Sequence, residues 1–172
     1  MGITVRSKQE LKNRIIEAQI GIQMSNDILE QVKAFEHRKQ VNKTFTDSFE
    51  ALGYHAYITK DKWSSKLVIR KRVTDEAHTG NNVYVEISIY HSEMMERQPF
   101  HWEEIKREVA KYDYAGRLAT AQEALNCVDD EIKEFEELVN YVESKDFKCF
   151  ELWRIKSDLK EALKDAKRNA IQ

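Results

Sequence analysis

The sequence is poor in the residues that break secondary structure or crosslink a chain. Its 172 residues include only 5 glycines, 1 proline and 2 cysteines. So few breakers in a chain with 34% charged residues are typical of long exposed helices, and they argue against a β-sandwich or a disordered chain. The two cysteines, Cys127 and Cys149, cannot form a disulfide framework or a four-ligand zinc site. We expect both to be buried free thiols on helices.

Long apolar runs and a strong net charge are also missing. No stretch approaches the roughly 18 consecutive apolar residues of a membrane span, and the N-terminus has no apolar signal region. The formal net charge of -2 produces no global field that would recruit nucleic acid or a membrane surface. We therefore expect a cytoplasmic protein without membrane partners.

Strict alternation of residue types predicts three strands in the middle of the chain. From 83 to 90, a valine or isoleucine alternates with a polar or aromatic residue, which is a strong strand signal. Residues 54–59 and 66–73 alternate in the same way. The pattern predicts an antiparallel meander with one apolar face and one mixed face.

Apolar residues at helical spacing predict helices on both sides of this sheet. A first long helix covers residues 7–40, and a short one follows near 44–52. A very long helix begins after Pro99 and runs to about residue 142, with Gly116 as its one candidate bend. The stripe of the first helix is Leu11, Ile15, Ala18, Ile22, Ser25, Leu29 and Val32. That of the very long helix is Tyr114, Leu118, Ala121, Leu125, Val128, Ile132, Phe135, Val139 and Val142. The stripe of a last helix is Leu152, Ile155, Leu159, Ala162 and Ala166.

These elements predict one α+β domain spanning residues 1–172, in the order α-α-β-β-β-α-α. Long helices form an antiparallel bundle or coiled coil, which accompanies a small three-stranded antiparallel sheet. Residues 42–113 would make the sheet-containing body, and residues 1–41 and 114–172 the helical bundle.

The mixed face of the sheet is the leading candidate for a binding surface. Tyrosine rings supply rigid apolar area and guanidinium groups supply forked donors. The predicted partner-binding residues are Tyr57, Arg70, Arg72, Tyr84, Glu86 and Tyr90. A purely structural alternative pairs both arginines with Glu86 across the strands, while the tyrosines shield the ladder.

Charge is segregated into two further clusters. Six cations and one anion lie between Lys60 and Arg72, whereas eight anions and one cation lie between Glu123 and Glu143. The basic hairpin is a candidate phosphate-contacting element, through Lys60, Lys62, Lys66 and Lys71. The acidic helix face is a candidate mimic of a phosphate backbone, through Asp129, Asp130, Glu134 and Glu137. Each cluster also has a simple explanation, as an edge-protecting hairpin or a solvated helix face.

Motifs of catalysis are not found. The sequence contains no glycine-rich phosphate loop and no nucleophile elbow, and the histidines and glutamates around Pro99 match no metal-ligand spacing. We expect no enzyme, no metal site and no cofactor.

Residues 44–112, in the order helix, three strands and helix, resemble a double-stranded-RNA-binding domain in topology and size. That family reads the shape of A-form RNA through its first helix, the loop between its first two strands and a basic start to its last helix. Here the last helix begins with an acidic stretch, Pro99–Glu104, where the family has lysines. No residue role is therefore transferred from the family.

The lysine- and glutamate-rich helical composition is similar to that of small accessory proteins of phages and mobile elements. The first hypothesis is a non-enzymatic interaction protein that binds and inhibits a host nucleic-acid-processing complex, such as a defence nuclease, in an anti-CRISPR-like manner. The second hypothesis is direct nucleic-acid binding through the basic hairpin. The third is a structural coiled-coil oligomer, such as a homodimer, formed by the long apolar stripes.

Overall fold

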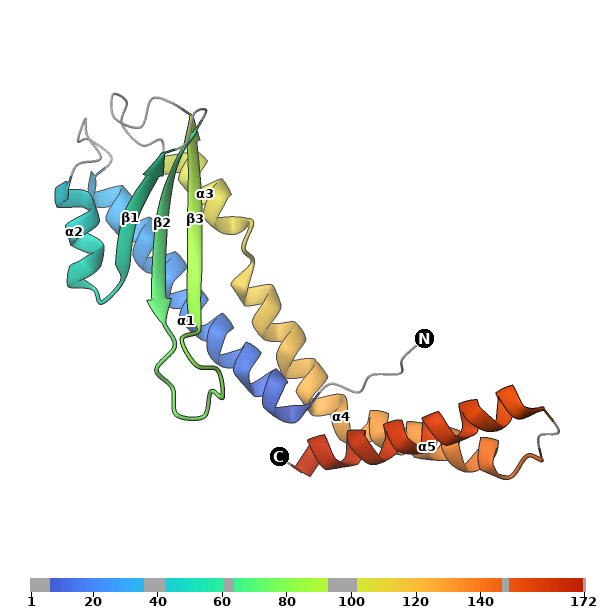
Figure 1. Cartoon of the computed structure of the whole chain (residues 1–172). Helices are drawn as coiled ribbons and strands as arrows, with labels where there is room; N and C mark the ends of the chain where they lie inside the picture. Colours follow the sequence, from blue (N-terminus) through green and yellow to red (C-terminus); the bar gives the residue numbers. More distant parts are fainter. Residues whose placement is uncertain (1–6, 36–42, 61–63, 93–101, 147–148, 172) are drawn as a thin grey trace. The chain divides into compact units, whose positions relative to one another are not determined.

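The computed structural model describes residues 7–35, 43–60, 64–92, 102–146 and 149–171. It confirms the predicted α+β class, with long helices and a three-stranded antiparallel sheet (Figure 1). The elements within these ranges are α1 (Lys8–Phe35), α2 (Lys43–Ala51), β1 (His55–Lys60), β2 (Ser64–Arg72), β3 (Tyr84–Ser92), α3 (Trp102–Ala110), α4 (Tyr114–Glu143) and α5 (Phe150–Ile171).

The chain divides into two compact units. The sheet unit consists of Ile16–Glu76 and Gly80–Leu118, and the hairpin unit of Met1–Ile15, Ala77–Thr79 and Ala119–Gln172. This division differs from the expected one, which began the sheet-containing body at residue 42. Residues 16–35 of α1 belong to the sheet unit because their apolar side chains pack beneath the sheet.

The sheet has the order β1-β2-β3, and α1 passes behind all three strands in Figure 1. Alternation along the strands turns Leu67, Ile69, Ile87 and Ile89 to the inner face, where each is at most 1% exposed. Burial of each such side chain stabilises the fold by about 1.5–3 kcal/mol. The helical residues in the same core are Met24, Ile28 and Val32 of α1, Phe49 of α2, Ile105 and Val109 of α3, and Tyr114 of α4.

The buried stripe of α1 differs from the predicted one in the sheet unit. The fully buried positions are Met24, Ile28 and Val32. The predicted Leu29 is only partly buried, and the hydroxyl of Ser25 donates to a backbone carbonyl of its own helix. Ala18 and Val32 of the predicted stripe are buried in this unit, whereas Met24 and Ile28 take the places that were predicted for Ser25 and Leu29.

A break at Asp113 divides the predicted very long helix into α3 and α4. Asp113 adopts a left-handed backbone conformation, with φ of 43°, and its carboxylate accepts a hydrogen bond from the Gly116 N–H at 3.2 Å. An aspartate in this position caps the start of α4, so that helix begins just before the glycine that was expected to bend it. The prediction of one continuous helix was therefore wrong.

The hairpin unit is built on the antiparallel pair α4 and α5. The apolar seam predicted for α4 is observed within this unit, because Val128, Phe135 and Val139 are all buried. Salt bridges from Lys160 to Glu143 and from Lys167 to Glu136 fix the antiparallel register. From α5, Leu163 and Ala166 are buried in the same core, and Leu159, Ala162 and Ala170 are partly buried against it. From α1, the core includes Leu11.

Two predictions for the hairpin unit are wrong. Leu152 and Ile155 were assigned to the buried stripe of the last helix but are 44% and 52% exposed. Cys127 and Cys149 are free thiols as expected, but both are exposed. In both cases the helical pattern identifies an apolar face without showing whether another helix covers it.

Gly21 of α1 lies against the ring of Tyr114, and a Cβ added there would overlap this buried ring. Helix propensity alone predicts that Gly21→Ala gains about 1 kcal/mol. We expect instead a net loss of about 1–3 kcal/mol in the free energy of unfolding, because the ring has to move within a packed core. Urea denaturation of Gly21→Ala and of the control Gln19→Ala, at an exposed position of the same helix, would test this. The control should stay within about 0.5 kcal/mol of wild type. An unfolding free energy for Gly21→Ala at or above that of wild type would contradict the close contact.

The buried phenol of Tyr54 donates a hydrogen bond to Asp27 of α1. Burial, that hydrogen bond and the negative charge of Asp27 together raise the pKa of Tyr54 well above its usual value of 10.0. Since folding raises this pKa, the resulting stabilisation is complete below pH 10 and is lost as the pH rises through the folded-state pKa. We expect the free energy of unfolding to fall more steeply above about pH 10 in wild type than in Tyr54→Phe. If the free energies of unfolding of wild type and Tyr54→Phe, measured by chemical denaturation, showed the same dependence on pH, ionisation of Tyr54 would not be the cause of the loss of stability at high pH.

Candidate partner-binding face

The six residues predicted to bind a partner lie together on the face of the sheet opposite α1. The strand register pairs Arg70 with Glu86 and Arg72 with Tyr84, and alternation turns these side chains away from the core. We call this surface the tyrosine–arginine face; it consists of Tyr57, Arg70, Arg72, Tyr84, Glu86 and Tyr90. Tyr84 and Tyr90 are 44% and 61% exposed.

Arg70 lies at the centre of the face, between two tyrosine rings from the neighbouring strands. Its guanidinium carbon is 5.4 Å from the ring centroid of Tyr57 and 4.9 Å from that of Tyr84. Each cation–π contact of this kind is worth about 0.5–1 kcal/mol at an exposed site. The two rings hold the side chain of Arg70 in place without occupying its hydrogen-bond donors.

One part of the structural alternative, the ion pair between Arg70 and Glu86, is not observed. The two residues are opposite one another in the register but form no ion pair, and Glu86 accepts a hydrogen bond from the Ser88 hydroxyl at 3.0 Å. Among the residues that the structure describes, the Nε of Arg70 is buried and has no hydrogen-bond partner. Because this Nε is covered, an acceptor from outside the chain would have to reach the partly exposed Arg70 through the other N–H groups of its guanidinium.

The surroundings of Arg70 are cationic and aromatic. The ammonium of Lys66 lies 5.3 Å from the ring centroid of Tyr90, and the ring of His55 lies 5.3 Å from that of Tyr57. Between these long side chains, Val68 is only 2% exposed at the middle of the face. The face therefore combines packed apolar area with guanidinium and ammonium groups.

The basic hairpin does not gather its lysines on one side. Lys66 lies on the tyrosine–arginine face, whereas the ammonium of Lys71 lies 5.2 Å from the ring centroid of Tyr54, which belongs to the core on the other face. An odd number of positions separates these two lysines along one strand, so alternation turns them apart. The side chains of Lys60 and Lys62 lie outside the described residues.

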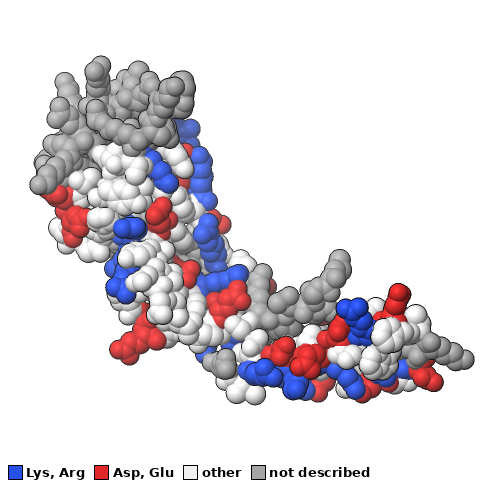
Figure 2. All heavy atoms as spheres, viewed as in Figure 1, with Lys and Arg blue, Asp and Glu red and all other residues white. Residues whose placement is uncertain are grey.

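The acidic face of α4 is partly neutralised. Asp129 pairs with Lys8 at 2.8 Å. Asp130, Glu134 and Glu137 form no ion pair with any described residue, and all three are exposed. Figure 2 shows acidic and basic side chains interspersed over α4 and α5 rather than a field of one sign. The three unpaired carboxylates form a short stripe, because their spacings of four and three residues keep them on one side of the helix.

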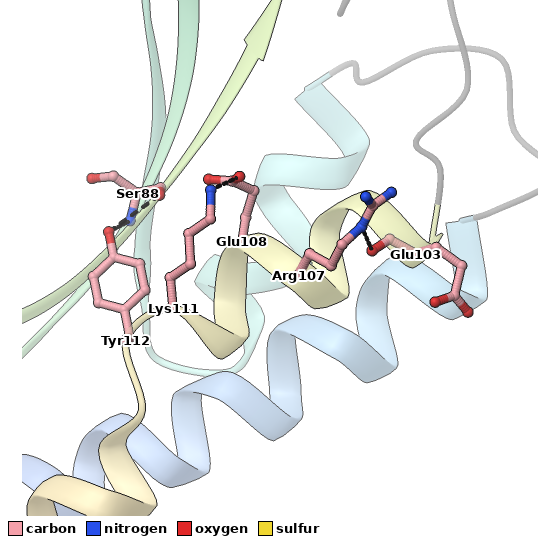
Figure 3. Close-up of polar contacts among 6 residues, drawn as sticks. All are labelled: Ser88, Glu103, Arg107, Glu108, Lys111 and Tyr112. Carbon is pink, nitrogen blue, oxygen red and sulfur yellow. Dashed lines mark hydrogen bonds and ion pairs between the residues drawn. The ribbon is translucent and has the colours of Figure 1, made fainter.

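Side chains close the free edges of the sheet. On β3, the Tyr112 hydroxyl accepts from the Ser88 N–H at 2.7 Å and donates to the Ser88 carbonyl at 3.1 Å (Figure 3). The Tyr114 hydroxyl donates to the Glu86 carbonyl at 3.2 Å. On β1, a carboxylate oxygen of Glu50 accepts from the backbone N–H of Ala56 at 3.3 Å. No pattern in the sequence indicated these roles, since Tyr112 and Tyr114 fit equally well as members of an apolar stripe.

In the part of the chain that the structure describes, no group of three or more histidine, cysteine or acidic residues could hold a metal ion. The histidines and glutamates around Pro99 lie outside the described side chains. None of the described helices combines the length and the apolar character that a membrane span requires.

Comparison with protein-family models, curated proteins and solved structures finds no match for this chain. The geometry of its surfaces therefore carries the functional interpretation.

Replacing Tyr112 by phenylalanine should destabilise the sheet unit. The substitution leaves the N–H and carbonyl of Ser88 without a partner at a position that is 6% exposed. We expect the free energy of unfolding to fall by about 1–3 kcal/mol. The control Tyr141→Phe, at a ring that is 62% exposed, should change it by less than about 0.5 kcal/mol. Equal effects of the two substitutions in thermal denaturation would show that the Tyr112 hydroxyl does not stabilise the edge of the sheet.

Proposed function

We propose that this protein is a non-catalytic binding protein of the cytoplasm whose tyrosine–arginine face docks on a protein partner. The observation that carries the proposal is Arg70, a partly exposed arginine that two tyrosine rings hold in place and that forms no ion pair with the carboxylate opposite it. The complementary surface on the partner offers a carboxylate to this guanidinium and apolar or aromatic side chains to the exposed tyrosines.

The fixed position of Arg70 is what favours binding over a merely structural role. An arginine that serves the fold is expected to use its donors within the chain, whereas Arg70 does not pair with the carboxylate directly opposite it. The rings of Tyr57 and Tyr84 already restrict the side chain of Arg70, so less conformational entropy is lost on binding. This preorganisation raises affinity. Tyrosine and arginine are also the residues that most often dominate protein interfaces.

Several features favour a protein partner over direct nucleic-acid binding. The face carries three cations, Lys66, Arg70 and Arg72, and Lys71 points to the opposite side of the sheet. Duplex binding draws most of its affinity from many phosphate contacts, which so few cations do not supply. Stacking of single-stranded bases needs free aromatic faces. Here Arg70 lies over the rings of Tyr57 and Tyr84, and Lys66 over that of Tyr90.

The unpaired acidic stripe on α4 supports a more specific form of the proposal. Asp130, Glu134 and Glu137 present carboxylates at helical spacing, and a row of this kind complements a basic groove that otherwise receives a phosphate backbone. The partner would then be a component of a nucleic-acid-processing complex, such as a defence nuclease, and occupation of its groove would inhibit it. This is the role of an anti-CRISPR-like accessory protein of a phage or mobile element.

The third hypothesis, an oligomer formed by the long apolar stripes, is not favoured by the packing. Val128, Phe135 and Val139 of α4 pack in one core with Leu11 of α1 and Leu163 of α5. A seam covered within its own chain is not available to another.

The proposal predicts that Arg70→Met loses the partner without losing the fold. Methionine retains apolar packing between the two tyrosines but loses both cation–π contacts, so the free energy of unfolding should fall by no more than about 1–2 kcal/mol. Hydrogen bonds to a charged group are worth about 1.5–3 kcal/mol, so recovery of the partner should fall by roughly tenfold or more. The measurement is affinity capture from lysate of the native host after nuclease treatment, with proteins quantified by mass spectrometry. Arg107→Met is the matched control, because Arg107 bonds within α3, where its Nε donates to the Glu103 carbonyl at 3.2 Å (Figure 3).

Two results would contradict the proposal. Loss of all captured protein on nuclease treatment, together with affinity that falls steeply with salt, would favour direct nucleic-acid binding. Equal recovery by Arg70→Met and Arg107→Met would remove the tyrosine–arginine face from the interaction.

A further inference from the structure

The antiparallel pair α4 and α5 has two flanks, and ion pairs mark one of them. The pairs fall at positions of α4 that are seven residues apart: Lys8 with Asp129, Lys167 with Glu136, and Lys160 with Glu143. Positions seven apart nearly coincide around a helix, so all three pairs lie on one side of the hairpin. Lys8 belongs to α1, whose Leu11 is buried in the core of the same unit. We call this side the closed flank.

The opposite side, which we call the open flank, exposes apolar side chains. Seen from the ion pairs, the residues at the far side of the buried line of each helix are spaced by four, three and four positions: Glu131, Phe135, Leu138 and Val142 of α4, and Glu151, Ile155, Asp158 and Ala162 of α5. Phe135 is buried, and Val142 and Ala162 are partly buried. Leu138 and Ile155 are 44% and 52% exposed. The apolar stripes of both helices are therefore incompletely covered on this side.

Exposed carboxylates border the apolar residues of the open flank: Glu131, Glu134, Glu151 and Asp158. In the described part of the chain, none of the four forms an ion pair. Arg154 lies one helical turn from Glu151 and from Asp158 but pairs with neither. The ammonium of Lys145 lies over the ring of Tyr141, 4.9 Å from its centroid. The open flank therefore keeps an excess of negative charge around an apolar centre.

We propose that the open flank binds an amphipathic helix of a partner protein, whose apolar stripe is bordered by lysines or arginines. Two antiparallel helices present their apolar stripes side by side, and a third helix packs along both as in a helical bundle. Aliphatic side chains of the partner helix cover Leu138 and Ile155. Its cations lie beside the carboxylates, so that each exposed group of the flank receives a complementary one.

Charge separates this occupant from the alternatives. A second copy of this chain would bring carboxylates of its own open flank against those of the first, and like charges disfavour such a contact. A nucleic-acid backbone is repelled for the same reason. The tyrosine–arginine face, which belongs to the sheet unit, carries cations and selects acidic groups instead. The open flank is thus a second surface of opposite preference, and it does not depend on the first.

A synthetic helix is the probe that tests the apolar part of this surface. The probe is a fluorescein-labelled peptide of about 18 residues, with leucine at heptad positions a and d and lysine at e and g. By fluorescence anisotropy at physiological salt, the full chain should bind it at least about tenfold tighter than a peptide of the same composition in shuffled order. Replacing both Leu138 and Ile155 by glutamine should raise the dissociation constant by about tenfold or more.

The matched control replaces Tyr141 and Trp153 by glutamine. These residues belong to the same two helices and are 62% and 57% exposed, but helical spacing places both away from the open flank. Its dissociation constant should stay within about threefold of wild type. Thermal melting followed by circular dichroism shows that each variant is folded at the temperature of the binding measurement.

The carboxylates are tested by a pair of charge variants that keep the apolar residues. Glu131→Gln with Asp158→Asn should weaken binding of the probe by about threefold or more, because two free carboxylates of the flank are lost. Glu123→Gln with Asp130→Asn removes the same charge from the outer side of α4 and should change binding by less than about twofold, since salt screens more distant charges.

Four results would overturn the proposal: no binding of the probe by wild type, equal binding of the shuffled peptide, equal losses in the flank variants and their controls, or a dimer of the full chain in sedimentation velocity that the two glutamine substitutions at Leu138 and Ile155 dissociate. Arg70→Met should bind the probe as wild type does, so failure of the open flank and failure of the tyrosine–arginine face are distinguishable.

Discussion

The packing of α1 against one face of the sheet is the interaction on which the sheet unit depends. Three strands are close to the smallest sheet that is stable in water, so the apolar inner face needs a continuous helical surface. Met24, Ile28 and Val32 supply that surface at a spacing of four residues, and Gly21 lets the ring of Tyr114 approach the same helix. Because Leu67, Ile69, Ile87 and Ile89 point to the inner face, the tyrosines and arginines that alternate with them point to the other side.

The other side of the sheet is organised by contacts between side chains of neighbouring strands. Arg70 on the central strand reaches the ring of Tyr57 on one side and that of Tyr84 on the other. Cation–π attraction orients the guanidinium without using its N–H groups, whereas an ion pair with Glu86 would have used them.

The strands and their faces could be predicted from the sequence because period-2 alternation is a local property of consecutive residues. The membership of the tyrosine–arginine face followed from the same alternation. Features that depend on tertiary contact were missed. The break at Asp113 arises from a left-handed residue and its capping carboxylate, and no breaker at that position signalled it. The exposure of Leu152 and Ile155 depends on whether another element covers their side of the helix, which helical periodicity does not record. The sequence also did not show that Arg70 forms no ion pair with Glu86. Arg70 instead contacts the rings of Tyr57 and Tyr84, which lie near it only after the strands have paired.

The hydroxyls of Tyr112 and Tyr114 on β3 and the carboxylate of Glu50 on β1 have a consequence for how this protein can evolve. They occupy some of the backbone groups through which a sheet could be extended by a strand from another molecule. The outward face of the sheet is set by side chains alone, so substitutions at a few outward positions could change its chemistry while the backbone scaffold stays constant.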